Sequence, residues 1–113
     1  YCVTVYVGGI RFYKPIHIGH LIKVNARLIF TGNTSMHISV DVYSKPVEEG
    51  GFIKNTHCIV VFAAVDKEGK TKKVDQWNPK TEEEEKLQDY AIRLMKLRKN
   101  IEEEMRPFLN LSE

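Results

Sequence analysis

Two β-type runs joined by a short turn constrain this chain more than any other feature. Apolar and polar side chains alternate strictly along residues 21–31 and again along residues 35–44. This period-two alternation indicates two strands, each with one polar face. Gly32 and Asn33 stand between the runs, and both residue types readily adopt the positive φ angles of a tight turn. The pattern therefore predicts an antiparallel hairpin with an apolar face that points into the core. The side chains expected on that inner face are Ile22, Val24, Ala26, Leu28, Phe30, Met36, Ile38, Val40 and Val42.

Two further stretches extend this sheet. Residues 2–7 alternate like a strand, and we expect a bulge at Gly8-Gly9 before the strand resumes over residues 10–13. Pro15 ends it, because proline has no N–H group to donate. Residues 53–65 are predicted to form a further strand, which is apolar on both faces from Cys58 to Val65. This is typical of a strand central to a sheet or at an oligomer interface.

A long helix is predicted after the sheet. Thr81 and Glu84 have the spacing of a capping box, and apolar residues then recur at helical spacing until Pro107, where we expect the helix to stop after about 25 residues. The chain is thus expected to be α+β, with residues 1–79 forming an antiparallel sheet. Residues 80–113 would form an amphipathic helix that packs on the sheet or on a partner subunit.

Bulk properties exclude several classes of protein. A length of 113 residues fits one domain, and a net charge of +2 is too small to indicate nucleic-acid binding. No apolar run approaches the roughly 20 residues of a membrane span, and no signal-peptide pattern is visible. The two cysteines, Cys2 and Cys58, fit buried free thiols in a reducing compartment better than a disulfide. We therefore expect a cytoplasmic protein that binds neither nucleic acid nor a membrane.

Chemistry-bearing residues do not assemble into a recognisable active site. The four histidines lack the spacing of metal ligands, so no metal is expected. His57 and Cys58 are adjacent on a strand and should point to opposite faces, which argues against a nucleophile pair. Asp41 could act as a general base, but no charged residue is adjacent to it in sequence, and a solvated surface carboxylate is the plainer interpretation.

An ordered set of short motifs identifies a family. The motifs are Val3-Thr4-Val5, Phe12-Tyr13-Lys14-Pro15-Ile16, Gly19, Thr31-Gly32-Asn33-Thr34-Ser35-Met36, Phe62-Ala63-Ala64-Val65-Asp66 and Gly69. In this order and spacing they resemble the hotdog-fold acyl-CoA thioesterases, in particular the bacterial short-chain acyl-CoA hydrolases and the related cytosolic acyl-CoA hydrolases. The resemblance covers about two-thirds of the chain.

The resemblance implies a hotdog-like sheet that wraps a central helix, and a homodimer that assembles into a trimer of dimers. It implies hydrolysis of acyl-CoA at the protomer interface by water that a carboxylate on the central helix activates. No separate cofactor is implied, since coenzyme A (CoA) is part of the substrate. Phe12 and Pro15 match residues that line the cleft. The residues that match the family's CoA-binding turn are Gly32, Asn33, Thr34, Ser35 and Met36.

Two departures from the family pattern stand out. His20 follows Gly19 where the family usually has an acid. The first strand, the central helix and its catalytic acid would all lie upstream of Tyr1, so the catalytic residue is left unassigned. Two alternatives to an enzyme stay open: a non-catalytic acyl-CoA-binding module, or an oligomerisation module.

Overall fold

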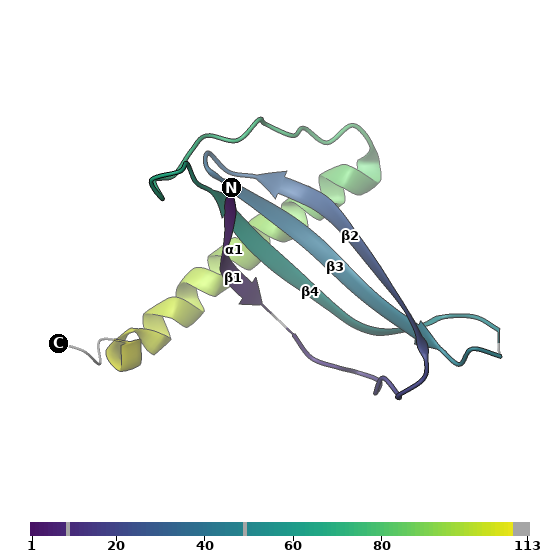
Figure 1. Cartoon of the computed structure of the whole chain (residues 1–113). Helices are drawn as coiled ribbons and strands as arrows, with labels where there is room; N and C mark the ends of the chain where they lie inside the picture. Colours follow the sequence, from purple (N-terminus) through teal and green to yellow (C-terminus); the bar gives the residue numbers. More distant parts are fainter. Residues whose placement is uncertain (9, 49, 110–113) are drawn as a thin grey trace. The chain divides into compact units, whose positions relative to one another are not determined.

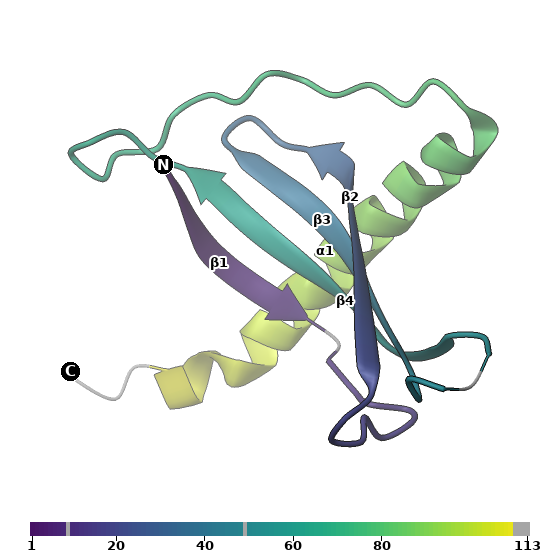
Figure 2. The same ribbon diagram turned by 45° about the vertical axis from the view of Figure 1, so that its right-hand side comes forward.

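Four antiparallel strands form the first of two units in this computed structural model, which describes residues 1–8, 10–48 and 50–109. The strands are β1 (Cys2–Gly8), β2 (Leu21–Thr31), β3 (Ser35–Lys45) and β4 (Ile53–Ala64). They lie side by side in the order β1-β4-β3-β2, as Figure 1 and Figure 2 show. The predicted α+β class, an antiparallel sheet followed by a long helix, is confirmed.

The ladder between β3 and β4 joins the two central strands of the sheet. It runs from Ser35 opposite Ala63 to Ser44 opposite Ile53. Between Val42, which faces Thr56, and Tyr43, which faces Lys54, the register shifts by one residue. The extra residue is Asn55, a β-bulge position that has no direct partner on β3. The central place predicted for this apolar strand is confirmed, because β4 lies between β1 and β3.

Strand β1 differs from its prediction at its second half. The bulge lies between Thr4 and Tyr6 rather than at Gly8-Gly9, and Gly9 itself is outside the described residues. A Cβ atom at Gly8 would overlap the ring of Tyr6, so a larger residue there would require that ring to move. Residues 10–13 were predicted to resume the strand and do not. They follow a path held by other contacts, described below.

The hairpin of β2 and β3 is confirmed, but the reason given for its turn is wrong. Neither Gly32 nor Asn33 has a positive φ angle. The turn instead closes with a hydrogen bond from Gly32 N to Ser35 O at 3.0 Å. A Cβ atom at Gly32 would lie 2.6 Å from Ser35 Oγ. Glycine is therefore favoured here by a close approach, and its conformational freedom is not used.

The predicted inner face of the hairpin is also wrong. Ile22 and Val24 are 56% and 58% exposed, whereas His37 and Ser39, on the opposite face of the hairpin, are each 3% exposed. Strand alternation shows that the two faces differ, but it does not show which face the described chain covers. The buried apolar residues of this unit are Ile29, Ile59 and Val61.

The second unit, Pro79–Glu113, contains the helix α1 (Glu82–Leu109). Thr81 caps it as predicted, because Glu84 N donates to Thr81 Oγ1 at 3.1 Å. The side chain of Glu84 accepts from Lys80 N at 2.8 Å. In an ideal capping box it would accept from the N–H group of Thr81, so this second contact is displaced by one residue. The predicted stop at Pro107 is wrong by two residues. Proline removes one hydrogen bond of the last turn without preventing Phe108 and Leu109 from following helically. Within the described residues no helix is long and apolar enough to cross a membrane.

The close approach of Gly32 to Ser35 gives a test of the turn. Gly32→Ala should lower the free energy of unfolding by about 1 kcal/mol, because Ser35 must leave its rotamer. In a Ser35→Ala background the same change should cost much less, since the clashing Oγ atom is gone. Chemical denaturation of the four proteins in this cycle measures the coupling. Gly51→Ala is the matched control, because a Cβ atom there meets nothing within 4 Å. Equal losses in both backgrounds would contradict the account.

Candidate functional site

The predicted CoA-binding turn is a well-braced structure at one end of the sheet. Its carbonyl oxygens are held from outside: Gln76 Nε2 donates to Gly32 O at 2.9 Å, Val74 N to Asn33 O at 3.1 Å and Ala64 N to Thr34 O at 2.9 Å. With these acceptors occupied, the turn presents N–H groups and short polar side chains. A group of N–H donors on a tight turn suits a phosphate or an amide of pantetheine.

A second brace holds the turn through Thr31. Trp77 N donates to Thr31 Oγ1 at 3.1 Å, and Thr31 Oγ1 donates to Gln76 Oε1 at 3.4 Å. Residues 74–77 therefore act as a strap across the hairpin end. From the sequence these residues were expected only to belong to the sheet region of residues 1–79, and no strap was predicted.

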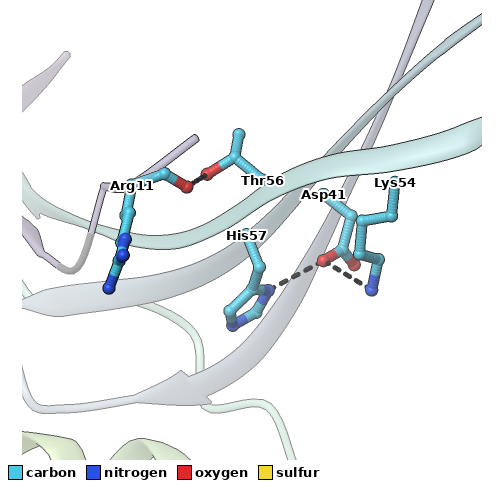
Figure 3. Close-up of polar contacts among 5 residues, drawn as sticks. All are labelled: Arg11, Asp41, Lys54, Thr56 and His57. Atoms are coloured by element: carbon cyan, nitrogen blue, oxygen red, sulfur yellow. Dashed lines mark hydrogen bonds and ion pairs between the residues drawn. The ribbon is translucent and has the colours of Figure 1, made fainter. Parts of the chain in front are cut away.

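The predicted cleft-lining residues lie on a segment that β4 holds in place. Thr56 Oγ1 donates to Arg11 O at 2.6 Å, as Figure 3 shows, and Tyr13 N donates to Asn55 O at 2.9 Å. Asn55 Nδ2 donates to both Lys14 O and Pro15 O at 3.1 Å. Because Asn55 is the extra residue of the β4 bulge, it can serve this segment rather than β3.

The Asn55 side chain is almost completely buried, and Phe12 beside the same segment is 57% exposed. This arrangement fixes the backbone and leaves the Phe12 ring available for contact. No role was predicted for Asn55, because it stands among the polar residues Lys54 and Thr56, where an asparagine carries no signal of its own. The amide nitrogen of Asn55 donates to the carbonyls of the neighbouring segment, whereas its Oδ1 atom is buried without a hydrogen-bond partner in the described chain.

The two predicted site regions are not brought together within one chain. The CoA-binding turn is tied to Ala64, at the end of β4, whereas Phe12 and Pro15 lie beside Asn55. The stretch of strand between those two positions spans roughly 30 Å at about 3.3 Å per residue. Within one chain the two regions are therefore too far apart to contact the same part of a ligand.

A polar cluster that the sequence did not reveal links β3 and β4. Asp41 lies directly across from His57 in the ladder, and its Oδ1 is 2.7 Å from His57 Nδ1 and 3.2 Å from Lys54 Nζ (Figure 3). Burial alone would raise the pKa of Asp41, but the hydrogen bonds from His57 and Lys54 outweigh it and hold that pKa below its ordinary value. The expectation of a solvated carboxylate without perturbing neighbours is therefore wrong. Its neighbours come from the adjacent strand, which local sequence does not show.

This cluster is suited to structure more than to catalysis. Asp41 stays ionised with its Oδ1 oxygen engaged twice, which makes it a weak proton acceptor. The Asp41 carboxylate correspondingly raises the pKa of Lys54. Burial, and to a smaller extent the charge of Asp41, raises the pKa of the Cys58 thiol, so Cys58 is not an activated nucleophile. Both cysteines are free as predicted, but neither is buried: Cys2 is exposed and Cys58 is half-buried.

A separate open pocket of about 330 Å³ lies beside the Gly19 turn. It is lined by Ile18, Gly19, His20, Pro46, Val47 and Glu48. Gly19 itself has a φ of +92°, a backbone conformation that favours glycine. His20 packs edge-on against His17 at 5.2 Å between ring centroids, and its Nδ1 atom is buried without a hydrogen-bond partner in the described chain. Across residues 1–8, 10–48 and 50–109, no three His, Cys, Asp or Glu side chains group as metal ligands would.

Comparison with known proteins gives these regions a context. Residues 1–50 match the family model described as "Thioesterase superfamily". An uncharacterized acyl-CoA thioester hydrolase of Buchnera aphidicola subsp. Schizaphis graminum is 38% identical over an alignment of 77 residues that covers 64% of this chain and 56% of that protein. This chain thus spans little more than half the length of that relative.

Two solved structures share the fold. The acyl-CoA hydrolase of Staphylococcus aureus, in complex with butyryl-CoA, CoA and CoA disulfide, is similar with a TM-score of 0.82 and 26% identity over 96% of this chain and 66% of that one. An apo-hexameric acyl-CoA thioesterase is similar with a TM-score of 0.80 and 31% identity over 88% of this chain and 64% of that one. The four-stranded sheet and the long helix together match hotdog-fold acyl-CoA hydrolases.

The hold of Asn55 on the segment of Phe12 and Pro15 can be tested directly. Asn55→Ala removes two hydrogen bonds and leaves two carbonyl groups without donors, so the free energy of unfolding should fall by about 2–3 kcal/mol. The exposed Asn25 on β2 provides the matched control, and Asn25→Ala should change stability by less than about 0.5 kcal/mol. Thermal or chemical denaturation measures both variants. Similar small effects for the two would show that the segment is not held through Asn55.

The Asp41 cluster predicts a pH-dependent difference. The pKa of Asp41 is lower in the folded chain than in the unfolded chain, so its stabilising effect is present above about pH 4 and is lost as the pH falls through the folded-state pKa. Asp41→Asn should therefore cost about 1 kcal/mol at pH 7 and almost nothing near pH 2. Denaturation curves of both proteins across this range provide the measurement. A difference that is constant with pH would contradict an ionic role for Asp41.

Proposed function

We propose, for a chain that belongs to the thioesterase superfamily, that it forms the CoA-binding sheet of an acyl-CoA thioesterase. The reaction is hydrolysis of the thioester of acyl-CoA to a free fatty acid and CoA. The observation that carries the proposal is the match of residues 1–50 to that superfamily, because these residues include β1, β2 and the whole turn from Gly32 to Met36. The names and bound ligands of the similar proteins support the same substrate class.

In this proposal the braced turn contacts the CoA part of the substrate. Backbone N–H groups and the side chains of Asn33, Thr34 and Ser35 would donate to phosphate or pantetheine oxygens. The strap at residues 74–77 occupies the carbonyl groups of Gly32 and Asn33, and Ala64 occupies that of Thr34, so the donors are held in position before the ligand arrives. Preorganised donors cost less to order on binding, which favours affinity.

The bond-breaking step requires water to add to the thioester carbonyl carbon while the C–S bond breaks and CoA leaves as a thiol. We assign no water-activating carboxylate among residues 1–113. Asp41 is a poor candidate because Lys54 and His57 already engage it and hold its pKa low. The exposed Phe12 ring and Pro15 are assigned to the cleft wall, held there by Asn55.

The proposal includes a homo-oligomer in the cytoplasm, with two protomers joined sheet to sheet and further assembled as a trimer of dimers. A hexameric thioesterase of similar fold supports it. Strand β1 is an edge of the sheet, and Val3, Val5 and Val7 on it are 46%, 56% and 43% exposed. An exposed apolar edge strand is suited to pairing with a second copy.

The experiment is a thioesterase assay on the protein that carries this chain. With butyryl-CoA or acetyl-CoA as substrate and a thiol reagent as reporter, clear turnover is expected. Thr34→Val should raise KM about tenfold with little change in kcat, since one hydrogen bond to the CoA part contributes on the order of 1.4 kcal/mol. Thr71→Val, at an exposed threonine that lies outside the turn and pairs with Val65, is the matched control and should leave both constants unchanged.

Three results would count against parts of this proposal. A protein that binds CoA but does not hydrolyse any acyl-CoA would favour the non-catalytic binding module. A protein that neither binds nor hydrolyses would favour an oligomerisation module. Turnover with an unchanged KM in Thr34→Val would keep the enzyme and remove the turn from the CoA site.

A further inference from the structure

The side-chain amide of Gln76 forms hydrogen bonds at both of its ends. Its Nε2 atom donates to Gly32 O at 2.9 Å and to Val74 O at 3.3 Å, and its Oε1 atom accepts from Thr31 Oγ1 at 3.4 Å. Carbonyl oxygens can only accept, so the two carbonyls also fix which end of the amide carries the N–H groups. Gln76 is an exposed residue on a segment without regular secondary structure. Holding such a side chain in one orientation costs conformational entropy, and the three hydrogen bonds offset that cost.

These bonds join the strap to two consecutive peptide groups of the turn. Gln76 holds Gly32 O, and Val74 N in the same strap donates to Asn33 O at 3.1 Å. Because a peptide group is planar and trans, a held carbonyl also fixes the direction of the N–H group of the next residue. The bond from Gln76 therefore orients the N–H group of Asn33, and the bond from Val74 orients that of Thr34. Both N–H groups belong to the proposed CoA-binding turn.

We infer that Gln76 is a positioning residue for CoA recognition, which acts through the turn rather than on the ligand itself. The inference rests on the proposed function, because it takes the turn as the CoA contact. Without the Gln76 amide, the peptide group between Gly32 and Asn33 loses its donor, and the turn must be ordered when the ligand binds. Substrate and transition state then lose the same binding energy, so KM rises while kcat is unchanged.

Gln76→Met tests this role, because methionine is also unbranched but neither donates like the amide nor accepts as strongly. In the protein that carries this chain, KM for butyryl-CoA should rise about fourfold while kcat stays within about twofold, as expected for one exposed hydrogen bond. The Kd of CoA, measured by titration calorimetry, should rise by the same factor. Gln88→Met, the same substitution at a half-buried glutamine on α1, is the matched control and should leave all three constants unchanged.

A double-mutant cycle separates positioning of the turn from a general loosening of the sheet. Thr34→Val should raise KM about tenfold alone but only about threefold beside Gln76→Met, because Thr34 is then already poorly placed. Beside Gln88→Met its full effect should persist. Circular dichroism confirms that each variant is folded. If Gln76→Met is unfolded, Gln76→Asn takes its place, since it keeps an amide but is one methylene too short to reach Gly32 O.

The outcomes distinguish this inference from the proposed function. Unchanged KM and Kd in a folded Gln76 variant would overturn the inference and leave the enzyme intact. An equal effect of Thr34→Val in every background would also overturn it. If the wild-type protein binds CoA without hydrolysing acyl-CoA, the proposed activity fails, and the Kd values of the same variants decide on Gln76. If the wild-type protein does not bind CoA at all, the proposed function and the inference fail together.

Discussion

The register between β3 and β4 is the constraint on which the rest of the sheet unit depends. It sets Asp41 across from His57, and it brings Ala64 to the turn so that its N–H group meets Thr34. It also contains the bulge that leaves Asn55 without a partner on β3. Because of this bulge, Asn55 can form hydrogen bonds with the backbone of residues 13–15. A shift of one residue would reverse the faces of both strands and remove all three contacts.

The two regions predicted to contact the ligand differ in character and in position. The turn offers donors held by an outside strap, and the segment near Phe12 offers an apolar ring on a fixed backbone. They stand at opposite ends of β4, so within a single chain neither completes the other. A site built from both would combine regions of two copies, which is consistent with the oligomer proposed above.

The sequence predicted the elements well and the surroundings of particular residues poorly. Strand alternation located β2 and β3, and the spacing of Thr81 and Glu84 located the start of α1. These are local properties, visible within a few residues. The Asp41 cluster and the role of Asn55 arise between segments 13 to 41 residues apart, so no local pattern carries them. The same limit explains why the inner face was misassigned: His37 and Ser39 are polar, yet they lie on the face that is buried.

The central claim is that the turn from Gly32 to Met36 contacts CoA. A crystal structure of the protein with butyryl-CoA tests it most directly. The account predicts phosphate or pantetheine oxygens within hydrogen-bonding distance of N–H groups or side chains at Asn33, Thr34 or Ser35. CoA bound elsewhere, with this turn in contact only with solvent, would contradict it.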